Sequence, residues 1–299
     1  MKCFFVVIIS LIINVVAIAQ IPKVKSGKLI RIENFTSQYV DARNVDVWLP
    51  ANYDGKTAFS VLYMHDGQML FDSNTTWNKQ EWKVDETITT LLQENKIKNT
   101  IVVGIWNNGK YRHSEYFPAK PLSYITQSLQ DSIIEKELHG KAQADNYLKF
   151  IVEELKPFID KTYRTFINRE NTFIAGSSMG GLISMYAICS YPEIFGAAAC
   201  LSTHWIGSLQ RNTNEIANAF QQYLQQHLPS PKNHNIYFDY GTATLDSFYK
   251  PYQLVVDDIM KKKGFASNNW MTKEFVGEAH TENAWSKRLH IPLEFILRK

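Results

Sequence analysis

The chain alternates between short apolar stretches and longer amphipathic ones. Residues 59–65 (FSVLYMH) and 99–106 (NTIVVGIW) are almost continuously apolar, as expected for strands that are buried on both faces of a sheet. Residues 44–50 (NVDVWLP) alternate between polar and apolar positions, which also predicts a strand. The same signals predict further strands at residues 171–176, 195–202, 235–241 and 269–277.

Two helical patterns between these strands have clear features. Through residues 145–163 apolar positions recur at spacings of three and four, and Pro157 falls inside the pattern. Pro157 is expected either to kink this helix or to mark its last turns. Residues 249–264 end in three lysines and Gly264, which is the signal of a helix C-terminus.

Strands that alternate with helices of this length predict βαβ units and a mostly parallel sheet. The first strands have no helix between them, so we expect an antiparallel edge there. About eight strands, flanked by helices, fit into a single α/β domain over residues 20–299. Residues 107–141 lack a clear strand, and we interpret them as an excursion over the top of the sheet that caps a site.

Residues 1–19 differ from the rest of the chain. Lys2 is the only charged residue before Lys23, and the apolar run between them ends in Ala17-Ile18-Ala19. A short positive end, an apolar core and an A-x-A site predict a secretory signal peptide that is cleaved near Ala19. A retained N-terminal anchor is the alternative. We therefore expect a periplasmic or secreted protein, without stable membrane association once the signal is cleaved.

Composition and charge exclude several classes of protein. The 299 residues are 45% hydrophobic and 20% charged, which is ordinary for a globular protein. A formal charge of +3, without any run of five like charges, predicts no nucleic-acid partner. Cys189 and Cys200 lie in apolar surroundings, so we expect two buried free thiols, although export would permit a disulfide. No Cys/His cluster has zinc spacing, so no metal site is expected. The sequence carries no signal for an oligomeric state.

A glycine-rich turn supplies the candidate nucleophile. Residues 176–180 (GSSMG) match Gly-x-Ser-x-Gly in one frame, centred on Ser178, because Ala175 rules out a frame centred on Ser177. An apolar strand enters this turn and a helical pattern leaves it, as in the nucleophile elbow of α/β hydrolases. The alternative is a glycine-rich loop without chemistry.

A serine needs a base, and the base needs an orienting acid. His280 follows the last predicted strand and is favoured as the base over His204, which precedes any plausible acid. Asp246 follows the strand at 235–241 and is favoured as the acid, whereas Asp239 lies within that strand. Capping of a helix is the alternative role for Asp246. The sequence therefore predicts a Ser178, Asp246 and His280 triad.

An oxyanion hole requires two backbone donors. The N–H of Met179, directly after the nucleophile, is the first. The second is expected from the turn after the strand at 59–65, where we assign it to Gln68, with Gly67 as the near alternative.

Seven segments together resemble a known family. They are VLYMHDGQMLFD, EWKVDETI, RHSEYFP, AGSSMGGLIS, YPEIFGAAACLSTHW, FDYGTATLD and GEAHTENAWSKRL, in this order. A chain with these segments resembles the large esterase family of α/β hydrolases that includes esterase D, feruloyl and acetyl-xylan esterases, enterobactin-type siderophore esterases and mycolyltransferases. The resemblance implies the α/β-hydrolase fold and the same roles for Ser178, His280, Asp246 and Gln68. Many members place their acid sooner after the Gly-Thr pair, where this chain has no carboxylate before Asp246.

Further residues are candidate substrate contacts. They are Asp66, Gly67, Trp77, Arg112, Tyr116, His204 and Trp205. Arg112 could bind a substrate carboxylate or polar headgroup, and its alternative is an ion pair with Glu115. Trp77 and Trp205 could line an aromatic acyl or sugar site, or they could be core residues.

Together these features predict an exported serine ester hydrolase that works through an acyl-enzyme and needs no metal or organic cofactor. Its expected substrates are small-molecule or polysaccharide esters, such as acetyl or feruloyl esters. A siderophore esterase is the alternative with the same chemistry. An acyltransferase would follow if residues 107–141 exclude water, and a non-catalytic protein that binds carbohydrate or another ligand is the alternative of another class.

Overall fold

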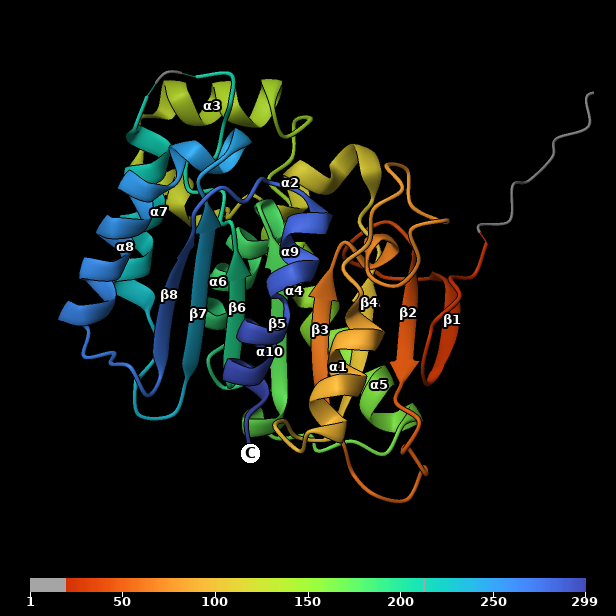
Figure 1. Ribbon diagram of the computed structural model, residues 1–299. Coiled ribbons are helices and arrows are strands. Elements are labelled where there is room, and N and C mark those ends of the chain that lie inside the picture. Colours follow the sequence, from red (N-terminus) through yellow and green to blue (C-terminus); the bar gives the residue numbers. More distant parts are fainter. Residues whose placement is uncertain (1–19, 212) are drawn as a thin grey trace, which may run out of the picture.

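The computed structural model describes residues 20–211 and 213–299 (Figure 1). The predicted signal peptide, residues 1–19, lies outside the described residues. The strands are β1 (Lys28–Phe35), β2 (Arg43–Leu49), β3 (Ser60–His65), β4 (Thr100–Ile105), β5 (Thr172–Ser177), β6 (Ala197–Leu201), β7 (Asn235–Gly241) and β8 (Trp270–Phe275). The α-helices are α1 (Val84–Gln93), α2 (Arg112–Tyr116), α3 (Gln127–Lys136), α4 (Ala144–Lys149), α5 (Lys156–Thr162), α6 (Met179–Ser190), α7 (Glu215–His227), α8 (Lys250–Lys262), α9 (Glu282–Arg288) and α10 (His290–Leu297).

The eight strands form one sheet in the order β1-β2-β4-β3-β5-β6-β7-β8. β1 and β2 are antiparallel to their neighbours, and every pair from β4 to β8 is parallel. The predicted antiparallel edge and mostly parallel sheet are therefore confirmed. β1 had no specific prediction, because its side chains at the sheet edge are only partly buried and its apolar pattern is weak.

Helices cover both faces of the sheet. In Figure 1, α1, α9 and α10 lie in front of it, and their apolar side chains form one core cluster. Helices α2 to α8 contribute to the second cluster, on the opposite face. In β3, Val61 and Tyr63 belong to the second cluster and Leu62 and Met64 to the first, since successive side chains of a strand point to opposite faces. Burial on both faces explains the continuous apolar runs of the central strands.

The helical pattern around Pro157 contains an irregular segment. A π-helical segment, Phe150–Leu155, separates α4 from α5, and Pro157 lies at the start of α5. The widened helical turn relieves the clash that a proline ring makes with the preceding turn. The helical run therefore continues past Pro157 to Thr162.

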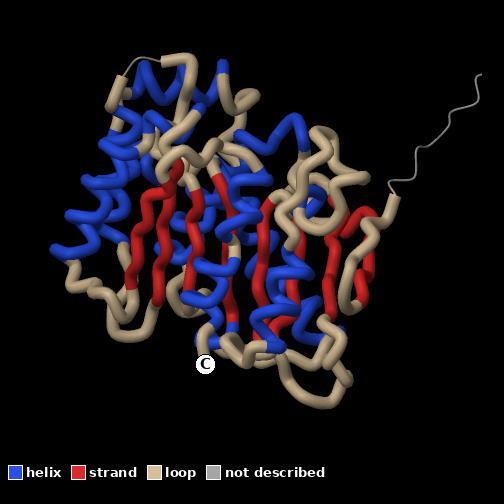
Figure 2. The backbone as a smooth tube through the Cα atoms, viewed as in Figure 1, coloured by secondary structure: helices blue, strands red, loops and turns tan. Residues whose placement is uncertain are grey.

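The arrows of the parallel strands point to the upper edge of the sheet in Figure 1, and loops gather along that edge in Figure 2. Residues 107–141, all of them described, contain helices and no strand, and α3 lies above this edge in Figure 1. Cys189 and Cys200 are buried and free, as predicted. Across the described residues, we find no helix that is long and apolar enough to cross a membrane.

A buried ion pair ties this excursion to the sheet. Arg43 begins β2 and Glu115 lies in α2, and both side chains are almost completely buried. The Arg43 Nη1 and Nη2 atoms lie 2.7 and 2.6 Å from the two oxygens of Glu115. Because both charges are buried away from water, each one needs the attraction of the other to offset its desolvation.

We expect Glu115→Gln to lower the free energy of unfolding by about 3–5 kcal/mol, because it leaves the Arg43 charge buried and uncompensated. Asp258→Asn is the control, since Asp258 forms an exposed ion pair with Lys262. Its effect should stay within about 0.5 kcal/mol. Chemical denaturation measures both, and an equal effect of the two substitutions would contradict the structural role of the buried pair.

Candidate active site

Ser178 occupies a sharp turn between β5 and α6. Its φ of 57° and ψ of −122° are strained for a residue with a side chain. The Ser178 N–H donates to the Leu201 carbonyl at 2.9 Å, and the Ser178 carbonyl accepts from the His204 N–H at 3.2 Å. The backbone on both sides of the strained residue is therefore held by hydrogen bonds.

Glycine is required where the strand and the helix meet. A Cβ atom on Gly176 would lie 2.7 Å from the carbonyl carbon of Gly180 and 2.8 Å from its oxygen. Real Cβ atoms do not approach backbone so closely, so a side chain at Gly176 would push the helix away from the strand. The Gly-x-Ser-x-Gly spacing thus reflects a steric limit.

His280 and Asp246 come together from loops after two neighbouring strands, β8 and β7. The His280 Nδ1 atom lies 2.5 Å from Asp246 Oδ1, and the His280 backbone N–H donates to Thr244 Oγ1 at 2.9 Å. A carboxylate beside Nδ1 accepts the proton on that nitrogen, which leaves Nε2 as the basic atom of the neutral ring. The side chain of Asp246 therefore binds His280 and does not cap a helix.

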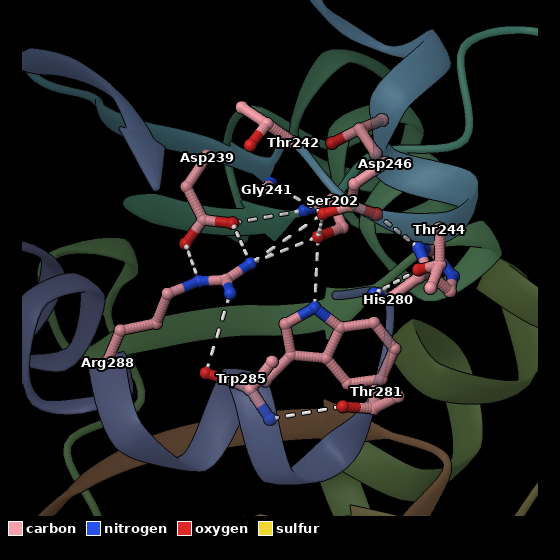
Figure 3. A network of polar contacts seen from close by, with 12 residues as sticks. Ser202, Asp239, Gly241, Thr242, Thr244, Asp246, His280, Thr281, Trp285 and Arg288 are labelled. Atoms are coloured by element: carbon pink, nitrogen blue, oxygen red, sulfur yellow. Dashed lines mark hydrogen bonds and ion pairs between the residues drawn. The ribbon is translucent and has the colours of Figure 1, made fainter. Parts of the chain in front are cut away.

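Asp246 is completely buried and still favours the ionised form. Burial alone would raise its pKa, but hydrogen bonds from His280, Ser202 and the Gly241 N–H lower the pKa below its ordinary value. Asp239, the other acid considered, lies in β7 and pairs with Arg288, with Oδ1 3.0 Å from Nη2. It makes its contacts on the side of the network away from His280 (Figure 3).

A cavity of about 480 Å³ is lined by both Ser178 and His280. Of the sequence-predicted residues, Asp66, Gln68, Trp77 and Arg112 also line it. Trp77 is 83% exposed, so a ligand in the cavity can contact its indole ring.

Arg112 pairs with Asp66 inside this cavity. Its Nε and Nη2 atoms lie 2.7 and 2.8 Å from the two carboxylate oxygens, and Asn107 Nδ2 donates to Asp66 Oδ1 at 2.7 Å. Burial would raise the pKa of Asp66, but the Arg112 charge lowers it. The alternative pairing of Arg112 with Glu115 is wrong, because the excursion turns Glu115 toward Arg43.

Four predicted substrate contacts lie outside the lining of this cavity: His204, which lines the second cavity described below, and Gly67, Tyr116 and Trp205. Tyr116 and Trp205 are completely buried: the Tyr116 hydroxyl accepts from the Asp66 N–H at 3.3 Å, and Trp205 Nε1 donates to Gln253 Oε1 at 2.9 Å. Gly67 is needed for a close approach, because a Cβ there would lie 2.5 Å from the Gly104 carbonyl carbon. Tyr116 therefore contacts a residue of the cavity lining, whereas Trp205 is a core residue.

Ser178 also lines a second cavity, of about 450 Å³. Met179 and His204 line it too, together with residues that sequence reasoning missed, namely His113, Lys136, Glu137, His139, Ser208, Leu209, Gln210 and Leu245. Several of them come from the excursion and no spacing signal pointed to them. The candidate nucleophile therefore lies between two cavities.

The backbone donors predicted for an oxyanion hole lie in first turns. Met179 is the first residue of α6, and Gln68 lies in the 3₁₀ turn Gly67–Met69. The N–H groups of a first helical turn have no acceptor within the helix, and the helix dipole favours negative charge there.

With this fold and these residues, the chain belongs to an esterase family. The family described as "Putative esterase" matches residues 37–289, most of the chain. The strand order and flanking helices are those of the α/β-hydrolase fold.

The proteins that this chain resembles have varied names. The chain is 27% identical over 188 residues to an endo-1,4-beta-xylanase/feruloyl esterase of Xylanibacter ruminicola, covering 60% of this chain and 22% of that protein. It is 23% identical over 206 residues to the ferri-bacillibactin esterase of Bacillus subtilis, covering 62% and 67%. A ferulic acid esterase structure superposes with a TM-score of 0.64 at 18% identity, covering 90% of this chain and 97% of that one. The chain spans 60% or less of the length of the first curated relatives it matches.

His204 generates a prediction about pH. Its Nδ1 lies 2.7 Å from the Tyr249 hydroxyl, and burial lowers its pKa from 6.5 to about 3. As the pH falls below 6.5, His204 takes up a proton in the unfolded chain but stays neutral in the folded protein. The free energy of unfolding of the wild type therefore falls. His204→Gln removes this contribution. Between about pH 7.5 and pH 5.5, the wild type should lose about 1.4 kcal/mol more stability than the variant.

Chemical denaturation of both proteins at the two pH values measures this difference. A stability difference that stays the same at both pH values would mean that His204 titrates normally.

Proposed function

We propose that the protein hydrolyses carboxylic esters, with Ser178 as nucleophile, His280 as base and Asp246 as the orienting acid. One observation carries the proposal: a serine on a strained turn and a histidine whose Nδ1 is held by a buried carboxylate line the same cavity. Membership of the esterase family supports it.

In the proposed reaction, Ser178 Oγ attacks the ester carbonyl and His280 Nε2 takes its proton. The backbone N–H groups of Met179 and Gln68 donate to the oxyanion, and loss of one such donor typically lowers kcat by about 10²–10³. Asp246 stays ionised and stabilises the imidazolium. His280 then protonates the leaving alcohol, and a water molecule activated by His280 releases the acid from Ser178.

The preferred substrates in this proposal are feruloyl or acetyl esters of polysaccharides. Among them, the two cavities favour feruloyl esters, which carry a sizeable group on each side of the carbonyl. An ester extends from its carbonyl in two directions, and Ser178 lies between two cavities. The exposed Trp77 indole offers a face for an aromatic acyl group or a sugar ring. The feruloyl esterase relatives agree with this substrate class.

A siderophore esterase is the second candidate, since a relative is named for ferri-bacillibactin. The charges in the cavity with His280 favour it less. Its lining carries two carboxylates, Asp66 and Glu282, and one guanidinium, Arg112, which already binds Asp66. An anionic iron complex would meet net negative charge there.

Export to the periplasm or beyond is part of the proposal. It rests on the pattern of residues 1–19, in which a positive end and an apolar run precede an A-x-A site. A polysaccharide substrate suits this location because such polymers lie outside the cytoplasm.

Ser178→Ala should abolish release of p-nitrophenol from p-nitrophenyl acetate, a loss of about 10⁴-fold or more. Ser177→Ala is the matched control, because Ser177 lies at the end of β5 beside it. This control should keep at least about a tenth of the wild-type rate, since no step of the mechanism uses the Ser177 hydroxyl. Wild-type turnover by Ser178→Ala would rule out the mechanism.

Trp77→Ala should raise KM for methyl ferulate about fivefold, because an exposed indole that stacks on the acyl ring contributes about 1 kcal/mol. KM for p-nitrophenyl acetate, whose acyl group has no aromatic ring to stack on the indole, should hardly change. Steady-state kinetics with both esters measure this. An equal rise of KM for both esters would mean that Trp77 does not recognise the acyl group. Faster turnover of a tri-catecholate siderophore than of methyl ferulate by the wild type would favour the siderophore esterase.

A further inference from the structure

Ser202 lies behind the proposed catalytic residues, directly after β6. It is completely buried and has a φ of 42°, a strained value for serine. Its Oγ atom lies 2.6 Å from Asp246 Oδ2, 2.9 Å from Trp285 Nε1 and 3.1 Å from Arg288 Nη2 (Figure 3).

The hydroxyl of Ser202 has only one direction available for its proton. The indole N–H of Trp285 and the guanidinium of Arg288 can only donate hydrogen bonds. They therefore occupy both acceptor positions of the Ser202 oxygen. The single O–H of Ser202 must then point to Asp246 Oδ2, where it finds a carboxylate.

This directed hydrogen bond fixes the carboxylate of Asp246. Its Oδ2 accepts from the Ser202 hydroxyl and from the Gly241 N–H, each at 2.6 Å. Its Oδ1 accepts from His280 Nδ1 at 2.5 Å. With both oxygens held, the carboxylate cannot rotate about its own axis, so the direction of the hydrogen bond to His280 is set.

Arg288 is kept from neutralising this carboxylate directly. Its Nε and Nη2 atoms bind the two oxygens of Asp239 at 3.2 and 3.0 Å, and Nη2 comes only to 4.0 Å from Asp246 Oδ2. A direct bidentate pair with Asp246 would withdraw its charge from the imidazolium of His280. Ser202 lies between Arg288 and Asp246. It donates a hydrogen bond to Asp246 without placing a full positive charge beside the carboxylate.

Trp285 connects the same serine to the ring of His280. While its N–H donates to Ser202, its ring packs edge-to-face against His280, with centroids 5.0 Å apart at 80°. Trp285 also lines the cavity that holds Ser178. The Trp285 indole therefore restricts both the ring of His280 and the side chain of Ser202, which in turn binds Asp246.

We propose that Ser202 is a positioning residue for the reaction: held by Trp285 and Arg288, it orients Asp246 and, through it, His280. The inference rests on the proposed ester hydrolysis. A misplaced acid leaves substrate binding intact but disturbs proton transfer in the transition state, so the effect should fall on kcat.

Two variants of Ser202 separate this role from a structural one. Ser202→Ala and Ser202→Gly both remove the hydroxyl, but glycine adopts a φ of 42° without strain. We expect both to lower kcat for p-nitrophenyl acetate about 10- to 100-fold with KM within about threefold, as misaligned reacting groups do. The glycine variant should be at least as stable as the alanine variant and equally slow.

Ser60→Ala is the matched control. Ser60 is also buried and its hydroxyl donates to Asn171 Oδ1 at 2.8 Å, but it begins β3 at the opposite end of the sheet from Ser178. This variant should lose stability without losing kcat. Wild-type kcat in folded Ser202→Gly would overturn the inference.

A second readout does not depend on activity. Proton NMR of wild-type protein should show the His280 Nδ1–H as a downfield resonance, because it is hydrogen-bonded to a fixed carboxylate. Ser202→Gly should shift this resonance upfield or broaden it, and Ser60→Ala should leave it unchanged. An unchanged resonance in Ser202→Gly would show that Asp246 needs no help from Ser202.

The experiment also separates the inference from the proposed function. If wild-type protein hydrolyses no ester, or Ser178→Ala remains active, the function fails, while the NMR comparison still tests the positioning of Asp246. If Ser178→Ala is inactive and Ser202→Gly is fully active with an unchanged resonance, the function stands and only the positioning role is overturned.

Discussion

The close approach of β5 and α6 at Gly176 and Gly180 is the constraint on which the site depends. The chain must reverse within one residue, and Ser178 takes up that reversal with a φ of 57°. Such a conformation costs about 1–3 kcal/mol. It persists because β5 is buried along its whole length and α6 along nearly all of it, so the surrounding core dictates the path of the backbone. The strain places the serine side chain between two cavities and beside the N-terminus of α6.

The buried charges near this turn all have hydrogen-bond partners. Asp246, Asp239 and Arg288 are almost completely buried, and each is held by hydrogen bonds at the ends of β6, β7 and α9. Buried ion pairs contribute little net stability, since desolvation offsets their attraction. Their value here is directional: Arg288 is tied to Asp239, Ser202 is oriented by Arg288 and Trp285, and Asp246 is left free to bind His280. These buried charges therefore fix the geometry of the site more than they add to stability.

The sequence predicted the elements whose signals are local. Continuous apolar runs located the central strands, because burial on both faces removes polar residues, and glycine spacing singled out Ser178, because only glycine permits the close approach. Chain order pointed to Asp246 and His280, and the structure places Asp246 Oδ1 2.5 Å from His280 Nδ1. Contacts between distant segments had no such signal. The partner of Arg112, the burial of Trp205 and the links of Ser202 join residues dozens of positions apart, so they emerge only when the chain is folded.

The central claim is that Ser178 becomes acylated while His280 and Asp246 manage its proton. Rapid acid quench of the protein during turnover of a feruloyl ester, followed by peptide mass spectrometry, tests this most directly. Acylation of Ser178 predicts a feruloyl group on Ser178 during turnover and none on Ser177. Ester turnover that leaves no acyl group on Ser178, or places it on another residue, would contradict the account.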